Sequence, residues 1–327
     1  MTPFTPPWWL RNAHAQTLTA ALAGAQPSVT WHEETWSSPD DDVLTVARLA
    51  GKPGHPVLVL FHGLEGSHRS RYIVHLALAA HSRGWHVVAP SFRACGDLFN
   101  RAPRLYHAGD SAEIHWMLHR VRLEYPEVPR YATGFSLGAN LLLKWLGELS
   151  HQAASWVDRC AAVATPFDLA LVGDHLATGF NRLYTQNFLA TLKRKAINKQ
   201  QQFPGLFDLT GALAATTLRQ FDDCCMAPLH GFYNAQDYWD RSSCRPFLAS
   251  IACPTLLLQA EDDPFVPRNA LPTAAHLSAT ITWDLQRHGG HVGFIAQPYG
   301  PGQPWMCQRI LHHLDAPPSL NPQDIAE

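Results

Sequence analysis

The fold of this chain can be worked out from one stretch of its sequence, Tyr131-Ala132-Thr133-Gly134-Phe135-Ser136-Leu137-Gly138-Ala139-Asn140. A β-prone run leads into the pattern Gly-x-Ser-x-Gly. Apolar residues follow it at positions 141, 142, 145, 146 and 149, which is helical spacing. The stretch therefore predicts a strand, a sharp turn and a helix, with the side chain of Ser136 presented on the turn.

A serine on such a turn is a candidate nucleophile. The turn lifts the hydroxyl clear of the sheet, and the glycines on either side keep the strand and the helix from crowding each other. The N–H of Leu137 would lie at the start of the helix, where it can stabilise a developing oxyanion. An ordinary glycine-rich βα turn would have the same five residues, so the catalytic interpretation depends on partners elsewhere in the chain.

The composition is that of a globular protein. The chain has 327 residues, of which 46% are hydrophobic and 16% charged, so it can form one large α/β domain with an insertion, or two domains. Lys and Arg number 25 and Asp and Glu 27, which gives a net charge of −2. Because no basic block stands out, we expect no nucleic-acid partner. The 19 histidines lack the spacing of a metal site, and we expect neither a metal nor another cofactor.

The cysteines and the chain start bear on the cellular location. The seven cysteines are odd in number and form no C-x-x-C motif, which favours a reduced, cytoplasmic protein. The first nine residues do not resemble a signal peptide. No apolar run approaches the roughly 20 residues that span a bilayer. The sequence gives no indication of the oligomeric state.

Apolar runs and helical periodicities alternate along most of the chain. This alternation predicts an α/β fold in which a mostly parallel central sheet is flanked by helices. The predicted strands are 29–36, 43–49, 56–61, 86–90, 131–135, 160–164, 254–260 and 279–285. The predicted helices are 73–82, 110–124 and 304–314, and a short helix is expected within 10–22.

One segment breaks this alternation. Residues 166–247 are helix-rich and aromatic, and we interpret them as a cap inserted between two sheet strands that covers Ser136 and shapes an apolar pocket. The α/β core would then comprise 26–165 and 248–315, preceded by an N-terminal arm, 1–25. A flexible tail, 316–327, would follow the core.

Two short patterns outside the core have competing interpretations. The adjacent Trp8 and Trp9 are predicted to plug the arm onto the main body, or alternatively to line an entrance for an acyl chain. The basic run Lys193-Arg194-Lys195 is predicted to be a solvated helix face. The alternative is peripheral contact with an anionic headgroup or a membrane surface.

Two later loops contain the partners that a serine nucleophile needs. A serine hydroxyl needs a histidine to take its proton, and the histidine needs a carboxylate on its other nitrogen. For the base we prefer His291 to His288, because Gly289-Gly290 allows a close approach. For the acid, Glu261, Asp262 and Asp263 compete. We prefer Asp263, with Asp262 as the alternative, because Asp-Pro-Phe-Val-Pro matches the D-x-x-V-P turn of this class of fold.

The predicted positions of these residues allow them to meet. Each follows a predicted buried strand, so all three can converge at the edge of the sheet where open α/β sheets bind ligands. The order Ser, Asp, His along the chain is that of α/β-hydrolases. The turn after strand 56–61 contains Leu64, whose N–H is the predicted second oxyanion donor. The alternative is a plain βα loop.

The chain resembles the α/β-hydrolase superfamily and, within it, the bacterial YheT-type esterase-like proteins, which are related to the eukaryotic ABHD1/ABHD3 group. The resemblance spans about residues 4–315 and departs from the family pattern at no catalytic position. The stretches that carry it, with that around Ser136, are Trp9-Leu10-Arg11-Asn12-Ala13-His14-Ala15-Gln16-Thr17-Leu18, His62-Gly63-Leu64-Glu65-Gly66-Ser67, Leu105-Tyr106-His107-Ala108-Gly109, Asp262-Asp263-Pro264-Phe265 and Gly289-Gly290-His291-Val292-Gly293-Phe294.

The resemblance implies hydrolysis of carboxylic esters through a Ser-Asp-His charge relay. The expected substrates are small-molecule acyl esters of short or medium chain length. Lipid esters, such as monoacylglycerols or medium-chain phospholipids, are implied by the eukaryotic relatives alone. The alternatives are an acyltransferase that uses the same triad and a non-catalytic binding protein of the same fold.

Overall fold

A computed structural model of the chain describes residues 3–23, 27–296 and 304–316. Within these ranges the strands form one eight-stranded sheet in the order β1-β2-β4-β3-β5-β6-β7-β8. The strand β2 pairs antiparallel with both β1 and β4, and all other pairs are parallel. The strands are β1 (His32–Ser37), β2 (Val43–Leu49), β3 (Val57–Phe61), β4 (His86–Pro90), β5 (Arg130–Phe135), β6 (Arg159–Val163), β7 (Thr255–Ala260) and β8 (Ile281–Gln286).

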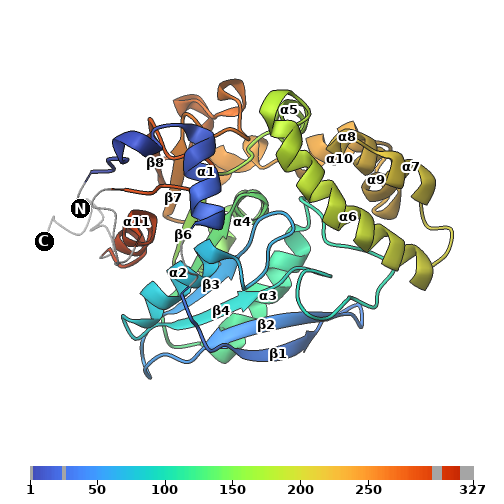
Figure 1. Ribbon diagram of the computed structural model, residues 1–327. Helices are drawn as coiled ribbons and strands as arrows, with labels where there is room; N and C mark the ends of the chain where they lie inside the picture. Colours follow the sequence, from blue (N-terminus) through green and yellow to red (C-terminus); the bar gives the residue numbers. More distant parts are fainter. Residues whose placement is uncertain (1–2, 24–26, 297–303, 317–327) are drawn as a thin grey trace, which may run out of the picture.

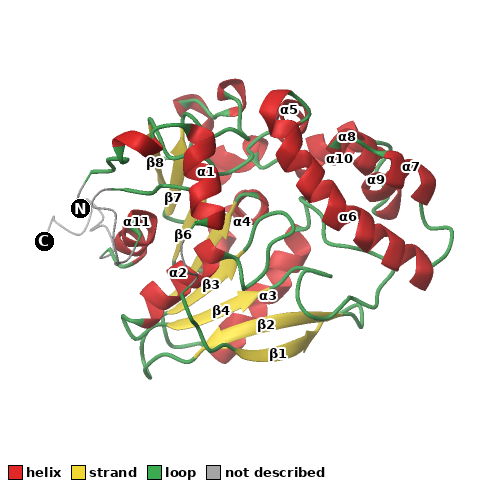
Figure 2. Ribbon diagram, in the orientation of Figure 1, coloured by secondary structure: helices red, strands yellow, loops and turns green. Residues whose placement is uncertain are grey.

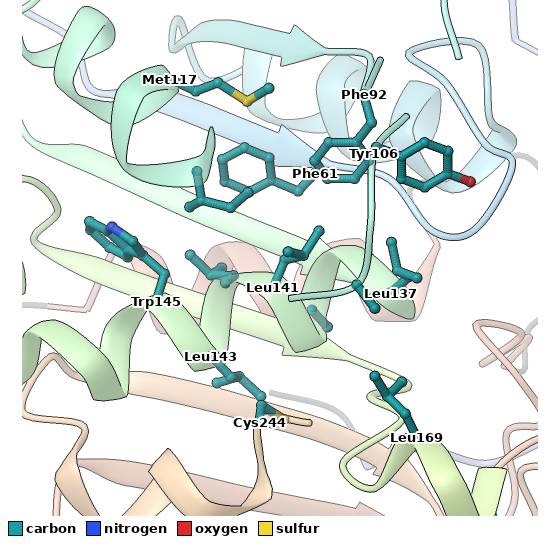
Figure 3. Packing of buried hydrophobic residues seen from close by; sticks show 14 of the residues in the cluster. Phe61, Phe92, Tyr106, Met117, Leu137, Leu141, Leu143, Trp145, Leu169 and Cys244 are labelled. Atoms are coloured by element: carbon teal, nitrogen blue, oxygen red, sulfur yellow. The ribbon is translucent and has the colours of Figure 1, made fainter. Parts of the chain in front are cut away.

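Helices cover both faces of the sheet (Figures 1 and 2). One face packs against α2 (Arg71–His81) and α11 (Trp305–Leu314), and the other against α3 (Ser111–Glu124) and α4 (Leu137–Leu149). Every residue of β3 and β7 is buried, which is why β3 is a continuous apolar run and β7 contains three consecutive leucines. The side chains between the sheet and α4 interdigitate closely, as Figure 3 shows. This packing fixes α4, and with it the turn at its start.

The segment between β6 and β7 is helical throughout its regular structure and lies beyond the carboxyl ends of the strands (Figure 1). It contains α5 (Leu169–Leu176), η3 (Gly179–Asn181), α6 (Arg182–Gln202), α7 (Leu209–Ala214), α8 (Leu218–Phe221), the π-helix η4 (Asp222–Met226), α9 (Ala227–Leu229), α10 (Ala235–Ser242) and η5 (Arg245–Ser250). The remaining helices are η1 (Trp8–Leu10), α1 (Ala13–Leu22), η2 (Ser150–Ser155), η6 (Arg268–Ala270) and η7 (Ala274–His276).

Buried amide side chains join this helical segment to α4 and to the loop after β7. Asn140 on α4 donates to Ser242 O and Ala108 O, and its side-chain oxygen accepts the N–H of Cys244. Asn181 donates to Pro264 O. The division of the chain into arm, core, cap and tail remains a prediction, and residues 1–2, 24–26, 297–303 and 317–327 of those units lie outside the described residues.

Two sequence-based expectations are wrong. Trp8 does not plug the arm onto the body, because it is 77% exposed, and the buried residue beside the two tryptophans is Leu10. Lys195 is not on a solvated face, because its side chain is only 14% exposed and forms an ion pair with Glu65 at 2.6 Å. The helical period places it on the inner side of α6, which charge alone could not indicate.

Candidate active site

The candidate nucleophile Ser136 occupies a strained turn between β5 and α4. Its φ is 52° and its ψ is −120°, a left-handed conformation that a non-glycine residue seldom adopts. The turn requires both neighbouring glycines. A Cβ on Gly134 would lie 2.4 Å from Gly138 O, and one on Gly138 would lie 2.5 Å from His62 O. Strand and helix therefore meet closely enough to fix where the hydroxyl points.

The structure brings His291 and Asp263 into one series with this serine. His291 Nε2 lies 2.9 Å from Ser136 Oγ. His291 Nδ1 lies 2.9 Å from Asp263 Oδ2 and 3.1 Å from Asp263 Oδ1. The side chains of His291 and Asp263 are 9% and 0% exposed, so the pair is shielded from water. This arrangement can take a proton from the serine hydroxyl and stabilise the resulting imidazolium.

The alternative candidates form a separate pair. Asp262 Oδ2 lies 3.1 Å from His288 Nδ1, and Asp262 Oδ1 accepts the N–H of Gly290 at 3.0 Å. Neither residue contacts Ser136 among the hydrogen bonds of the described chain. The carboxylate of Asp262 therefore braces the histidine loop, while that of Asp263 faces the imidazole of His291.

The side chains of Ser136, His291 and Asp263 are held in place by residues to which the sequence analysis gave no role. Gln259 Nε2 donates to Asp263 Oδ2 at 3.1 Å, and the N–H of Phe265 donates to Asp263 Oδ1 at 2.9 Å. The ring of Phe265 stacks on the imidazole of His291 with centroids 4.1 Å apart. Phe265 follows Asp263 by two residues, a spacing at which a carboxylate commonly accepts a backbone N–H. This spacing is the one sequence signal that could have indicated the contact.

The N-terminal helix also supports the histidine. Thr17 Oγ1 on α1 accepts the N–H of His291 at 2.9 Å. The amide of Gln16 bonds both backbone groups of Ile295, further along the same loop. Gly290 has a φ of 59°, and a Cβ there would lie 2.6 Å from Ala13 O. The string of residues around Gln16 and Thr17 carried the resemblance in the sequence, but nothing in it indicated this contact.

The loop after β3 carries Leu64, the second predicted oxyanion donor. It passes close to the nucleophile, since a Cβ on Gly63 would lie 3.0 Å from the Cβ of Ser136. The N–H of Gly63 donates to Tyr72 Oη and that of Glu65 to Tyr106 Oη. Within the described ranges, the N–H groups of Leu64 and Leu137 have no acceptor. Both are thus available to a negatively charged oxygen at the site.

Buried side chains hold this loop from two directions. Glu65 Oε1 accepts from Tyr106 Oη at 2.7 Å and from Lys195 Nζ at 2.6 Å, which links the loop to α6. His62 Nε2 accepts the N–H of Phe92 at 3.0 Å, so its Nδ1 carries the hydrogen that is donated to Gly63 O. Burial lowers the pKa of His62 to about 3, and its imidazole is therefore neutral at pH 7.

Three further observations concern the whole described part of the chain. No group of three or more His, Cys, Asp and Glu side chains in it could hold a metal ion. None of its helices is both long enough and apolar enough to cross a membrane. All seven cysteines are free thiols.

Comparison with known proteins identifies the family that this chain resembles. The family described as alpha/beta hydrolase fold matches residues 56–298. The chain is 36% identical over 312 residues to “Putative esterase YheT” of Escherichia coli K12, a match that covers 94% of this chain and 91% of that protein. It is 24% identical over 302 residues to phospholipase ABHD3 of Homo sapiens, covering 89% and 73%.

A solved structure agrees at the level of the fold. Esterase Pf2001 of Pyrococcus furiosus has a TM-score of 0.55 at 16% identity, and the match covers 87% of this chain and 89% of that one. At this identity the likeness concerns the fold alone. Together, the eight-stranded sheet, the family match and the relatives lead to one conclusion: this chain belongs to the alpha/beta hydrolase fold family, among its esterase-like and lipase-like hydrolases.

Proposed function

We propose that this protein is a serine hydrolase that cleaves carboxylic esters, with Ser136, His291 and Asp263 as its catalytic triad. The observation that carries the proposal is the unbroken series from Ser136 Oγ through both ring nitrogens of His291 to the carboxylate of Asp263. The family of the chain and the name of its relative in Escherichia coli support the same reaction class.

The proposed reaction has two halves. His291 Nε2 takes the hydroxyl proton as Ser136 Oγ attacks the ester carbonyl carbon, and the N–H groups of Leu64 and Leu137 stabilise the oxyanion. The bond from that carbon to the alcohol oxygen then breaks, and His291 gives its proton to the departing alcohol. Water attacks the acyl-enzyme in the same way, which releases the acid and restores the serine. Asp263 holds the imidazole in the required tautomer throughout.

The substrate proposed is an ester of a short or medium-length acyl chain, including lipid-derived esters. An apolar cavity that begins at Ser136 and continues under the helices between β6 and β7 supports this, since apolar walls suit a hydrocarbon chain. We propose that residues 166–247 act as the cap that forms this cavity. The name of human ABHD3, a phospholipase, supports a lipid substrate. The seven free cysteines support a reducing compartment such as the cytoplasm.

Replacement of the nucleophile tests the proposal. Ser136→Ala should lower kcat for p-nitrophenyl esters by about 10⁶, as loss of a catalytic serine does elsewhere. A fluorophosphonate probe should label the wild type and fail to label the variant. Ser155→Ala, at an exposed serine of η2, is the matched control and should keep full activity. Full activity in Ser136→Ala would refute the proposal, and acyl transfer to an added alcohol would point to an acyltransferase.

A further inference from the structure

A tight turn after β3 carries Leu64, the proposed oxyanion donor. The N–H of Gly66 donates to Gly63 O at 3.0 Å, which closes a four-residue turn with Leu64 and Glu65 at its centre. Glu65 has a φ of 57°, in the left-handed region that favours glycine at this position of a turn. The backbone of a glutamate does not prefer this conformation, so the turn depends on contacts with other parts of the chain.

The phenol of Tyr106 binds Glu65 at two points. Tyr106 Oη accepts the N–H of Glu65 at 3.0 Å and donates to Glu65 Oε1 at 2.7 Å. Burial raises the pKa of Tyr106 well above its ordinary value, so its hydroxyl keeps the hydrogen that it donates. The ring of Tyr106 stacks on Phe92, and Phe92 on Phe61 at the end of β3, with centroids 5.7 and 6.3 Å apart (Figure 3). These contacts fix one side of Glu65 to the sheet.

Lys195 on α6 holds Glu65 from another direction. Lys195 Nζ lies 2.6 Å from Glu65 Oε1 and 5.1 Å from the ring centroid of Tyr106. The side chains of Lys195 and Glu65 are 14% and 6% exposed, so water screens their attraction only weakly. The thiol of Cys95 lies 3.0 Å from Lys195 Nζ, but burial raises its pKa to about 11, and it is neutral at pH 7. Glu65 therefore supplies the negative charge that the ammonium of Lys195 meets.

The contribution of this pair is better sought in position than in stability. A buried ion pair adds little net stability, because the loss of hydration offsets the attraction between the charges. A carboxylate held by both an ammonium and a phenol is nevertheless restricted to the arrangement that satisfies both donors. Leu64 directly precedes Glu65, so a shift of the Glu65 backbone would move the N–H of Leu64. A displacement of about 1 Å at a reacting centre can cost about 10² in rate.

We infer that Lys195 and Glu65 are positioning residues, through which helix α6 fixes the direction of the Leu64 N–H toward the oxyanion. The inference rests on the proposed ester hydrolysis and adds to it a role for the helical segment between β6 and β7. That segment then does more than cover Ser136, because full stabilisation of the oxyanion requires α6 to be docked on the loop after β3.

Loss of the ammonium tests the inference. Lys195→Met should lower kcat/KM for a p-nitrophenyl ester by about tenfold or more, since a displaced donor costs less than the 10²–10³ of a deleted one. The inhibition constant of a trifluoromethyl ketone should rise by the same factor, because its tetrahedral adduct with Ser136 carries the same oxyanion. Wild-type values of both quantities would overturn the inference and leave ester hydrolysis standing. A wild-type protein that neither hydrolyses p-nitrophenyl esters nor binds the ketone would overturn both proposals.

A second buried lysine of α6 provides the matched control. Lys199 is 0% exposed and donates to Asn100 O at 3.1 Å and to Ala102 O at 2.8 Å, away from the loop after β3. Lys199→Met should lower the thermal midpoint but keep kcat/KM within about twofold of the wild type. If it lowered kcat/KM as much as Lys195→Met, a general loosening of α6 would explain both effects, and the inference would be overturned.

Removal of both charges separates position from stability. Lys195→Met leaves Glu65 buried without its counter-charge, whereas the double variant Lys195→Met/Glu65→Met buries no unpaired charge. Its thermal midpoint should return toward the wild-type value, while kcat/KM stays low and the inhibition constant stays high. Glu65→Met alone should show the same kinetic losses, although Glu65, unlike Lys195, does not line the apolar cavity at Ser136. Wild-type kinetics in the double variant would mean that the pair is merely structural and would overturn the inference.

Discussion

Two aspartate–histidine pairs lie side by side at the carboxyl edge of the sheet, and they differ in their surroundings. The side chains of Asp263 and His291 are 0% and 9% exposed, and the second nitrogen of His291 continues to Ser136. The side chains of Asp262 and His288 are 21% and 30% exposed, and Asp262 continues only to a backbone N–H in the same loop. The residue types and the distances within the two pairs are nearly the same.

The comparison teaches that surroundings separate a candidate catalytic pair from a bracing pair. An ion pair with access to water contributes little free energy, because water screens the charges and the side chains lose entropy. A carboxylate shielded from water and held by two further donors can instead fix the tautomer of its histidine. Asp263 has those donors in Gln259 and the N–H of Phe265. We expect the two pairs to respond very differently to the same substitution.

The largest effect is expected at Asp263. Asp263→Asn removes the charge and presents an amide that favours the wrong tautomer of His291, so kcat should fall by about 10⁴. Steady-state kinetics with a p-nitrophenyl ester measure this. KM should change far less than kcat, because the substitution does not touch the substrate site. A variant that keeps more than about a tenth of the wild-type kcat would contradict the proposed role.

An intermediate effect, on stability, is expected at His62, which is 1% exposed and has no carboxylate partner among the described residues. Burial lowers its pKa from 6.5 to about 3, so between these values the unfolded chain binds a proton that the folded protein does not. Stability must therefore be complete above about pH 6.5 and fall as the pH falls, by about 1.4 kcal/mol per pH unit for this residue.

A variant without the titrating ring isolates this contribution. In His62→Gln the amide oxygen can still accept the N–H of Phe92, but it takes up no proton. Urea unfolding between about pH 6 and pH 4 should show a shallower loss of stability in the variant than in the wild type. Since other buried histidines titrate in both proteins, the difference between the two slopes is the quantity of interest. Identical slopes would mean that His62 is protonated without unfolding.

The smallest effect is expected at Asp262. In Asp262→Asn the side-chain oxygen can still accept the N–H of Gly290, and only the partly exposed contact between the carboxylate and His288 is altered. The kcat should fall by no more than about fivefold. This variant is the matched control for Asp263→Asn, because the same change is made one residue away. If both variants lost activity equally, burial would not be what separates the two pairs.

Most of the fold could be predicted from the sequence because its signals are local. Continuous apolar runs marked the buried strands, and helical spacing marked the helices, with ends within three residues of those found. The sharp turn at Ser136 was predictable because its two glycines allow a close approach of strand and helix that a Cβ would block, and because a strand and a helix flank it. The same local patterns gave the loops that carry Asp263 and His291, which the structure brings together with the serine.

What the sequence could not supply depends on contacts between distant segments. The sequence placed Lys195 in a solvated basic run. In the structure its side chain is mostly buried and forms an ion pair with Glu65, on the loop after β3. Thr17 carries no chemical signal of its own, yet it holds the backbone of His291. Periodicity shows that a helix has an inner face, and it does not show which distant residue that face will meet.

The contact between Thr17 and His291 joins residues that are 274 positions apart. During synthesis, the histidine loop leaves the ribosome 274 residues after Thr17 of α1. A nascent chain therefore contains Ser136 before it contains His291, the base that we propose. On the proposed mechanism, chemistry can begin only after the histidine loop has been made, and α1 is already present to hold that loop when it arrives.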